Sequence, residues 1–355
     1  MLVRIVSSFT PLMAVRVYRE YPGQRLITQV YGSVQYAGNS VHASHFLMMR
    51  GNCTPPRALY CSNPHAHVRR WNAGMGHDIM GDIHGQAGKL KALLKQLGYC
   101  ERMGAWRHPE RSARFVGDLI DRGPGQLETL DIVRRMGDAG SADAIMGNHE
   151  FNGIAYATQD PERPGEHLRT RGPGNHARHR AFLDEVAVDS AVHQEWVQWF
   201  MTLPLWIETD QVRRVHACRH PASMAAIADR LGPGNTLTPE LVLAAGRKDS
   251  VAVVAVEASC KGLEIALPAP VSFTDKQRIA RHRTRVRWWD SAIARYDQAK
   301  PVFFGHYWFS GRPGVISATA CCVDYSAALP GEPRVAYRFD GEDALCSDKV
   351  VAVRA

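Results

Sequence analysis

The sequence predicts an α/β (α+β) fold in which short apolar strands alternate with amphipathic helices. Two observations predict it: five apolar runs each lead into a polar residue, and segments with apolar residues at helical spacing lie between them. The length agrees, because 355 residues with 45% hydrophobic content can bury one large core and a small appendage.

The five apolar runs are predicted to be strands. They comprise residues 77–80, 114–116, 144–146, 212–215 and 302–304, and they lead into Asp82, Asp118, Asn148, His216 and His306. Ligands of α/β sheets bind beyond the carboxyl ends of the strands. We therefore expect these five polar side chains to converge on one place.

Two helices are predicted between the first three strands. Residues 87–97 and 127–136 carry apolar residues at helical spacing. The chain lengths that separate Asp82, Asp118 and Asn148 suit strand–helix–strand units. The first half of the fold is therefore expected to hold parallel strands connected by helices.

The later part of the chain is predicted to be less regular. Residues 178–201 read as one helical stretch, which Pro204 ends. Residues 219–300 interrupt the rhythm of strands and predict an inserted, mostly helical cap that ends in shorter strands. Residues 314–324 and 334–339 are rich in β-formers around a Leu-Pro-Gly turn, so they predict a terminal hairpin.

Residues 1–74 form a basic N-terminal extension. They contain eight arginines and one acidic residue, and thus +7 of the net charge of +8. A transit peptide, an arm that binds nucleic acid and an extension without a folded role are three interpretations. We favour the third, because Met75 directly precedes the first clear strand and Met80 ends it, so that a compact domain could begin there. The extension is therefore expected to be disordered or poorly structured, and the folded domain to span 75–355.

The composition indicates the cellular compartment. Apolar runs such as 251–256 are far too short to cross a bilayer, and no signal peptide follows the first methionine, so neither a membrane span nor secretion is expected. Eight cysteines without a CxxC pattern predict reduced thiols and a cytoplasmic location. Cys53, Cys61, His65 and His67 could form a zinc cluster, but their spacing matches no common zinc finger.

Three glycine-flanked motifs carry candidate metal ligands. Gly-Asp-Ile-His-Gly places the Asp82 carboxylate and the His84 imidazole two residues apart, at a turn that the glycines permit. The second motif adds the Asp118 carboxylate, and Gly-Asn-His-Glu adds the Asn148 amide and the His149 imidazole. Oxygen and nitrogen donors of this mix suit pairs of Mn, Fe or Zn ions with a bridging carboxylate.

In this order, Gly-Asp-x-His-Gly, Gly-Asp-x-x-Asp-Arg-Gly and Gly-Asn-His-Glu resemble the signature of the calcineurin-like metallophosphoesterases, in their phosphoprotein phosphatase branch. The resemblance extends to His216 and His306 and covers residues 78 to about 325. It implies a four-layer αββα sandwich with a helical cap insertion, a catalytic domain over 75–355, and a metal-dependent phosphoester hydrolase of bacterial type.

The resemblance also implies residue roles. One metal would be held by Asp82, His84 and Asp118, and the second by Asp118, Asn148, His216 and His306. Arg122 and Asn148 would bind phosphate oxygens, while His149, oriented by Asp121, would protonate the leaving oxygen. A second phosphate-binding arginine, taken as Arg285, is expected among Arg281, Arg283, Arg285 and Arg287.

Two divalent ions suit the expected chemistry. Mn is the first choice, with Fe or Zn as alternatives. A metal pair lowers the pKa of a shared water, holds it in line with phosphorus and neutralises charge on the phosphoryl oxygens. The protein then has to add only a clamp for the phosphate and an acid for the leaving group.

Three functions compete. Hydrolysis of phosphomonoesters is expected first, with phosphoserine or phosphothreonine proteins or a small phosphoester as substrate. Cleavage of dinucleoside polyphosphates such as diadenosine tetraphosphate is the alternative enzyme activity. A non-catalytic protein that binds nucleic acid through the basic extension is the third possibility. The complete ligand set argues against it, so neither nucleic acid nor a membrane is expected as a partner.

Two histidine features refine the expectation. Relatives that cut nucleic acids or cyclic nucleotides end in Gly-His-x-His, whereas here Gly-His-Tyr-Trp supplies His306 alone, which favours the phosphatase branch. His220 lies four residues after His216 and could be a further ligand or a donor to one. A histidine of the core or surface is the favoured interpretation of His220.

Overall fold

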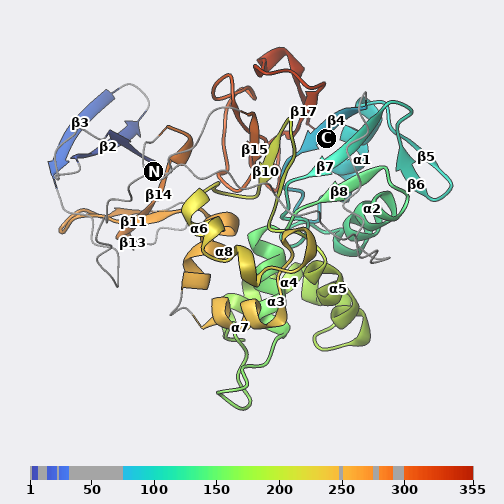
Figure 1. The fold of residues 1–355 in the computed structure, drawn as a ribbon, viewed down its shortest axis with the longest axis horizontal. Coiled ribbons are helices and arrows are strands. Elements are labelled where there is room, and N and C mark those ends of the chain that lie inside the picture. Colours follow the sequence, from blue (N-terminus) through green and yellow to red (C-terminus); the bar gives the residue numbers. More distant parts are fainter. Residues whose placement is uncertain are drawn as a thin grey trace, which may run out of the picture.

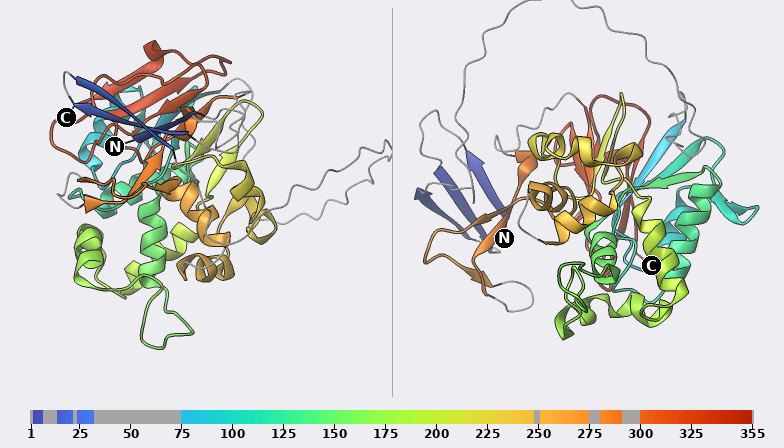
Figure 2. Two further views of the ribbon diagram at one scale, coloured as in Figure 1. Left: turned by 90° about the vertical axis from the view of Figure 1, so that its left-hand side faces the viewer. Right: turned by 60° about the horizontal axis from the view of Figure 1, so that its bottom comes forward.

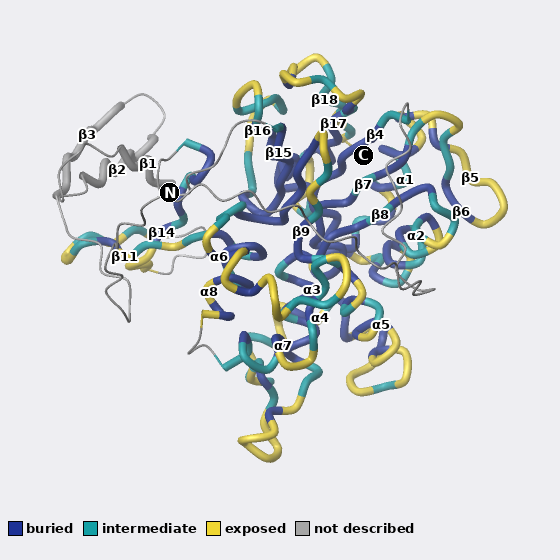
Figure 3. The backbone as a smooth tube through the Cα atoms, viewed as in Figure 1, coloured by how far each residue is buried: buried dark blue, intermediate teal, exposed yellow. Residues whose placement is uncertain are grey.

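The computed structural model describes residues 75–247, 251–274, 280–290 and 300–354, together with the backbone of three strands in the N-terminal extension (Figure 1). Two mixed sheets face each other at the centre, and most of their strands are buried (Figure 3). Among the described residues, none of the helices combines the length and the apolar character needed to cross a membrane.

The first central sheet has the strand order β18-β17-β4-β7-β8. Its strands are β4 (Gly76–Met80), β7 (Arg111–Phe115), β8 (Ala142–Ala144), β17 (Arg334–Phe339) and β18 (Val350–Val353). Strands β4, β7 and β8 run parallel, whereas β17 is antiparallel to both β4 and β18. The three parallel strands therefore share one carboxyl edge.

The second central sheet has the order β16-β15-β10-β9. Its strands are β9 (Trp206–Glu208), β10 (Arg213–Val215), β15 (Val302–Phe304) and β16 (Ala320–Cys322). Strands β10, β15 and β16 are parallel. The five predicted strands thus exist, but they are divided between two sheets.

Helices α1 (Ala87–Gln96) and α2 (Gln126–Asp138) lie where the sequence predicts helices. They are followed along the chain by α3 (Asn148–Ala157), α4 (Pro173–Val186), α5 (Ala191–Met201), α6 (Pro221–Ala225), α7 (Pro239–Gly246) and α8 (Val251–Lys261). Figure 1 shows α3, α4, α5 and α7 grouped below the two sheets.

Successive side chains of a strand point to opposite faces of its sheet and pack in different layers. In β15, Phe303 packs between the sheets with Ile79 and Tyr337, whereas Phe304 points to the other face and stacks on Trp289 at 4.9 Å between ring centroids. Helices α1 and α2 pack on the first sheet. The result is the predicted αββα sandwich.

Helix α8 belongs to the outer layer on the second sheet. The backbone N–H groups of Ala217 and Cys218, which follow β10, donate to the carbonyls of Ser259 and Ala258. The described part of 219–300 is helical first and then forms short strands, as predicted: β11 (Glu264–Ala266), β12 (Phe273–Thr274), β13 (Ala280–Arg281) and β14 (Arg283–Val286).

Two predicted elements need correction. Residues 178–201 are not one helix, because Ala187 takes a φ of +59° that ends α4, and the Ser190 hydroxyl caps α5 by accepting from the His193 N–H. The terminal hairpin is also wrong as predicted, because β16 and β17 lie in different sheets. The hairpin partner of β17 is β18 instead. A second small hairpin joins β5 (Cys100–Arg102) to β6 (Ala105–Arg107).

The N-terminal extension contains three strands where the sequence predicts little regular structure. They are β1 (Leu2–Val6), β2 (Ala14–Tyr21) and β3 (Gln24–Tyr31). Strand β1 pairs with β14 in a separate sheet of order β11-β14-β1-β2-β3, seen from further sides in Figure 2. Cys53, Cys61, His65 and His67, the considered zinc cluster, lie outside the described residues.

Candidate metal centre

The candidate ligands lie at the carboxyl ends of strands from both sheets. Asp82, Asp118 and Asn148 follow β4, β7 and β8 of the first sheet. His216 and His306 follow β10 and β15 of the second. The structure brings all five side chains together in one place, as the sequence predicts. The strands that carry them belong to two sheets.

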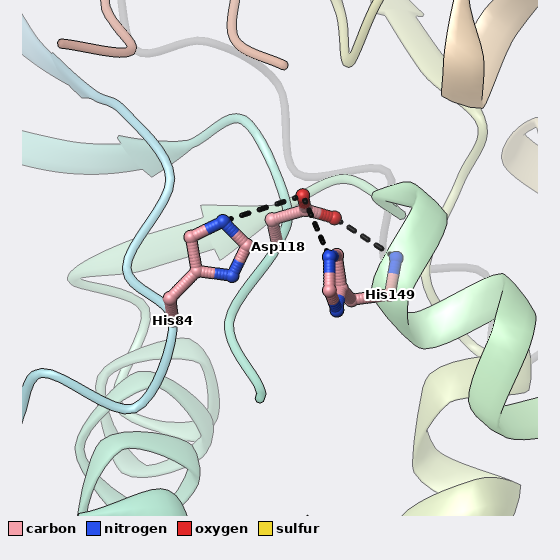
Figure 4. Close-up of side chains that lie close together, drawn as sticks. All are labelled: His84, Asp118 and His149. Carbon is pink, nitrogen blue, oxygen red and sulfur yellow. Dashed lines mark hydrogen bonds and ion pairs between the residues drawn. The ribbon is translucent and has the colours of Figure 1, made fainter. Parts of the chain in front are cut away.

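Asp118 lies at the centre of this group. Its Oδ1 atom is 3.3 Å from Nε2 of His216, and its Oδ2 atom is 3.7 Å from Nε2 of His84 and 3.8 Å from Nε2 of His149 (Figure 4). The carboxylate is 2% exposed. One carboxylate therefore faces imidazoles on both of its oxygens, as a bridging ligand must.

Backbone carbonyls fix the orientation of two of these imidazoles. The Nδ1–H of His84 donates to the carbonyl of Ile120 at 3.0 Å, and the Nδ1–H of His216 donates to that of Val116 at 2.7 Å. Since a carbonyl can only accept, Nδ1 carries a hydrogen in both rings, and Nε2 is the atom that faces Asp118. Both rings are thus held in the orientation that binds a metal ion.

Asn148 joins His216 and His306 on the second side. Its Oδ1 atom is 2.6 Å from Nδ1 of His306 and 3.3 Å from Nε2 of His216. The three donor groups Asp118, His216 and His306 offer atoms that all lie within 4.8 Å of one another. This is the arrangement expected of the second ligand group.

The first ligand group differs slightly from the expected set. The donor atoms that lie within 4.8 Å of one another belong to His84, Asp118 and His149. Asp82 lies at the side of this group. Its Oδ2 atom is 4.0 Å from Nε2 of His84 and accepts from the backbone N–H of His306 at 3.0 Å. His149, assigned to acid catalysis, thus borders the place where the first ion would lie.

Buried polar atoms fit the binding of cations here. Among the described residues, Oδ1 of Asp82, Nε2 of His84 and Nε2 of His306 are buried without a hydrogen-bond partner. Leaving such atoms unpaired is costly, and carboxylate and imidazole donors are the ones that Mn, Fe and Zn share. The residues present therefore fit two divalent ions.

The charges at the site point the same way. Burial, together with the Asp324 carboxylate, raises the pKa of Asp82 well above its usual range. Burial opposes ionisation of Asp118 too, but His216 and His149 outweigh it and hold the pKa of Asp118 well below its usual range. The carboxylates raise the pKa of His216 to about 10 against the effect of burial. Divalent ions bound here would favour the ionised forms of both carboxylates.

The loops that carry the ligands are held in an unusual backbone conformation. His84, Asp118, Asp121, Arg122 and His306 all have φ between +51° and +72°. Non-glycine residues adopt this region rarely, and such strain collects at functional sites. Gly305 also allows a close approach, because a Cβ atom there would lie 2.0 Å from Oδ1 of Asp82.

Glu150 holds the Asp118 loop in this conformation. Its fully buried carboxylate accepts from the backbone N–H groups of Gly147 at 2.8 Å, Asp118 at 2.9 Å and Leu119 at 2.8 Å. The fourth residue of the Gly-Asn-His-Glu motif therefore ties two ligand-bearing loops to each other.

His149 and Asp121 form the expected pair. Nδ1 of His149 is 2.5 Å from Oδ2 of Asp121. Burial disfavours the charged imidazole, but Asp118 and Asp121 outweigh it and raise the pKa of His149. A raised pKa keeps a proton on the group that would donate it.

Arg122 is the exposed member of the site. Its Nη2 atom is 3.5 Å from Nε2 of His149, and its guanidinium carbon lies 4.2 Å from the centroid of the Trp308 ring. The backbone N–H of Trp308 in turn donates to the buried Asp324 carboxylate at 2.7 Å. Trp308 therefore supports Arg122 at the edge of the centre.

Replacing Trp308 by Ala is expected to raise KM for a phosphomonoester about fivefold while changing kcat less. The loss of a cation–π contact of about 1 kcal/mol frees the guanidinium without removing it. Steady-state kinetics measure both constants, and Trp308→Phe, which keeps an aromatic face, serves as the control. A fall in kcat with KM unchanged would contradict a supporting role.

The remaining predicted residues lie further out. Arg285 is half-buried on β14, with Nε 4.0 Å from Oε1 of Glu264, and its charge contributes after burial to the lowered pKa of His306. His220 is no member of either ligand group among the described residues, and its Nδ1 atom lies 2.6 Å from the Ser223 hydroxyl. Of the two interpretations of His220, the structure supports a histidine outside the centre.

Several site residues carry no signal in the sequence. His179 contacts Asp121 from α4, Asp324 lies beside Asp82, and the guanidinium of fully buried Arg334 donates to the carbonyls of Asp82 and Ile83. None of the three belongs to a glycine-flanked motif. Only tertiary structure brings them to the centre.

Comparisons with known proteins agree with this geometry. Residues 78–227 match the model of the calcineurin-like phosphoesterase family. An asymmetrical bis(5'-nucleosyl)-tetraphosphatase PrpE of Halalkalibacterium halodurans is 43% identical over 76 residues, which are 21% of this chain and 31% of that protein. The PrpE of Bacillus subtilis is 31% identical over 135 residues, 37% of this chain and 52% of that protein. The chain thus spans about a third to a half of these relatives.

A solved structure described as a serine/threonine phosphatase of Saccharomyces cerevisiae with similarity to human PP5 is 12% identical. It has a TM-score of 0.46, with 81% of this chain and 82% of that chain covered. The family match contains the motifs that carry Asp82, Asp118, Asn148 and His216, which the structure gathers with His306. Over residues 78–227, the chain is therefore similar to the calcineurin-like phosphoesterase family.

Proposed function

We propose that this protein is a divalent-metal-dependent hydrolase of phosphomonoesters, with phosphoserine and phosphothreonine side chains as the substrates. The observation that carries the proposal is the position of Asp118, whose two carboxylate oxygens face imidazoles of two separate ligand groups. An acid pair and an exposed arginine border the same carboxylate. The match of residues 78–227 to the calcineurin-like phosphoesterase model supports the reaction class.

The residues divide the work as follows. Asp82, His84 and Asp118 would hold one ion, and Asp118, Asn148, His216 and His306 the other, with Mn as the ion that suits these donors best. Such ions act as Lewis acids that activate water and neutralise charge on a phosphoryl group. In this scheme Arg122 binds two phosphoryl oxygens from the exposed side of the centre.

His149 supplies the proton for the leaving oxygen. Asp121 accepts the Nδ1–H of His149, so the ring turns its Nε2 toward Asp118 and the reacting group. The backbone N–H of His149, in the first turn of α3, donates to Asp118 at 2.9 Å. The positive end of that helix therefore favours the anionic substrate as well.

A second candidate activity is cleavage of dinucleoside polyphosphates. The curated relatives are named as tetraphosphatases, which act on substrates with several phosphates. Arg283 lies two residues before Arg285 on β14, Arg281 ends β13, and both are exposed. Guanidinium groups on this segment would suit phosphates beyond the one that is attacked.

Comparing kcat/KM for a phosphoserine peptide and for diadenosine tetraphosphate distinguishes the two activities. Under the first proposal the phosphopeptide is the better substrate, and Arg283→Gln leaves its hydrolysis unchanged. A hundredfold preference for the tetraphosphate, reduced by Arg283→Gln, would establish the second candidate instead. Arg122→Ala, expected to impair both reactions, shows that the activity measured comes from this centre.

A further inference from the structure

We propose that His179 is a positioning residue of the catalytic acid, which holds Asp121 in the orientation that His149 requires. The inference rests on the proposed function, because it concerns the same proton transfer. It adds a third member, contributed by a different helix, to the pair formed by His149 and Asp121.

The geometry places one imidazole on each oxygen of a single carboxylate. Nδ1 of His179 is 2.8 Å from Oδ1 of Asp121, while Nδ1 of His149 is 2.5 Å from Oδ2. All three side chains are buried. The carboxylate therefore bridges α3, which carries His149, and α4, which carries His179.

Proton donation by His149 depends on the orientation of Asp121. To give up the hydrogen on Nε2, His149 needs Nδ1–H directed at a fixed acceptor. Asp121 has a φ of +71° in the loop after β7, and a carboxylate held through one oxygen can still rotate about its terminal bond. A donor on the second oxygen removes this rotation.

The surroundings of His179 agree with a dedicated role. Its ring packs against Tyr156 at 5.4 Å and Phe182 at 5.2 Å between centroids, which fixes the ring plane. Its Nε2 atom is buried without a hydrogen-bond partner. Among the described residues, the hydrogen bond of the His179 ring is the one to Asp121.

The test uses the leaving group of the substrate. An alkyl phosphate needs a proton on its leaving oxygen, whereas p-nitrophenyl phosphate releases p-nitrophenolate, a weakly basic anion that needs little acid catalysis. We expect His179→Leu to lower kcat for the alkyl ester by about 10- to 100-fold, the usual effect of removing an outer partner, with a much smaller loss for p-nitrophenyl phosphate and little change in KM. His179→Asn, whose amide can donate from the position of Nδ1, should restore kcat.

His193→Leu is the matched control. His193 is equally buried, packs on the same Phe182 ring and has an unpartnered Nε2, but its Nδ1 accepts from the Asp189 N–H. Its replacement should not separate the two substrates. An equal loss of kcat on both substrates in His179→Leu, or no loss on either, would overturn the proposal.

A crystal structure of His179→Leu provides a readout that is independent of activity. We expect the Asp121 carboxylate to be rotated away from Nδ1 of His149 in this variant and to keep its contact in His193→Leu. An unmoved Asp121 would refute the positioning role. A wild-type protein without phosphatase activity would instead refute the proposed function, while the crystallographic comparison still decides the role of His179.

Discussion

Asp118→Asn is expected to lower kcat/KM for a phosphomonoester by about 10³-fold or more, after the protein has been stripped of metal and supplied with Mn. Among the described residues, Asp118 is the carboxylate that both ligand groups share. An amide keeps the shape but removes the negative charge and one of the two acceptor oxygens. Loss of a single electrostatic contact at an active centre costs roughly 10²- to 10³-fold, and this side chain makes contacts on two sides.

Activity and metal content should be measured on the same preparations. Asp138→Asn changes an exposed carboxylate at the end of α2 and should leave both values unchanged. Elemental analysis is expected to show less bound metal in Asp118→Asn than in the wild type. Wild-type turnover by Asp118→Asn would show that the shared carboxylate is dispensable and would refute the two-metal proposal.

Glu150→Ala is expected to lower the free energy of unfolding by about 4 kcal/mol. The carboxylate is fully buried and accepts from the backbone N–H groups of Gly147, Asp118 and Leu119. Each donor left unpaired in the interior costs about 1–3 kcal/mol, and only part of this loss is recovered by water that enters the space. Urea denaturation with a fluorescence readout measures the difference.

Glu110→Ala, at an exposed position, provides the comparison for Glu150→Ala. It should change stability by less than about 0.5 kcal/mol, as surface substitutions usually do. A similarly small effect of Glu150→Ala would mean that the Asp118 loop keeps its conformation without this side chain. Its positive φ values would then need another cause.

Much of the centre can be predicted from the sequence because its members lie in short, contiguous motifs. Asp82, Asp118 and Asn148 each follow the end of a strand, so the strand pattern indicates where they lie in the fold. The other residues of each motif are adjacent in the chain and therefore lie near the same strand end. The sequence does not show that His216 and His306 come from a second sheet, since the pattern of a strand is the same in either sheet.

The missed features depend on contacts between distant segments. The wrong hairpin arises because β-forming patterns of 314–324 and 334–339 do not specify partners, and β16 adds to β15 while β17 adds to β4. The break at Ala187 depends on one backbone angle in an otherwise helical pattern. His179 is two turns into a helix, and nothing local marks its contact with Asp121.

The division of the ligands between two sheets has a consequence for how the protein is made. Synthesis delivers Asp82, Asp118 and Asn148 early, together with β4, β7 and β8, but β15 and His306 are joined to the chain much later. The inner face of the first sheet, with Ile79, has to wait for Phe303 of β15 before it is covered. A nascent chain that stops at residue 227, the end of the family match, therefore lacks both a metal donor and part of its core. We therefore expect metal ions to bind more tightly to chains that contain β15 and His306 than to shorter nascent chains.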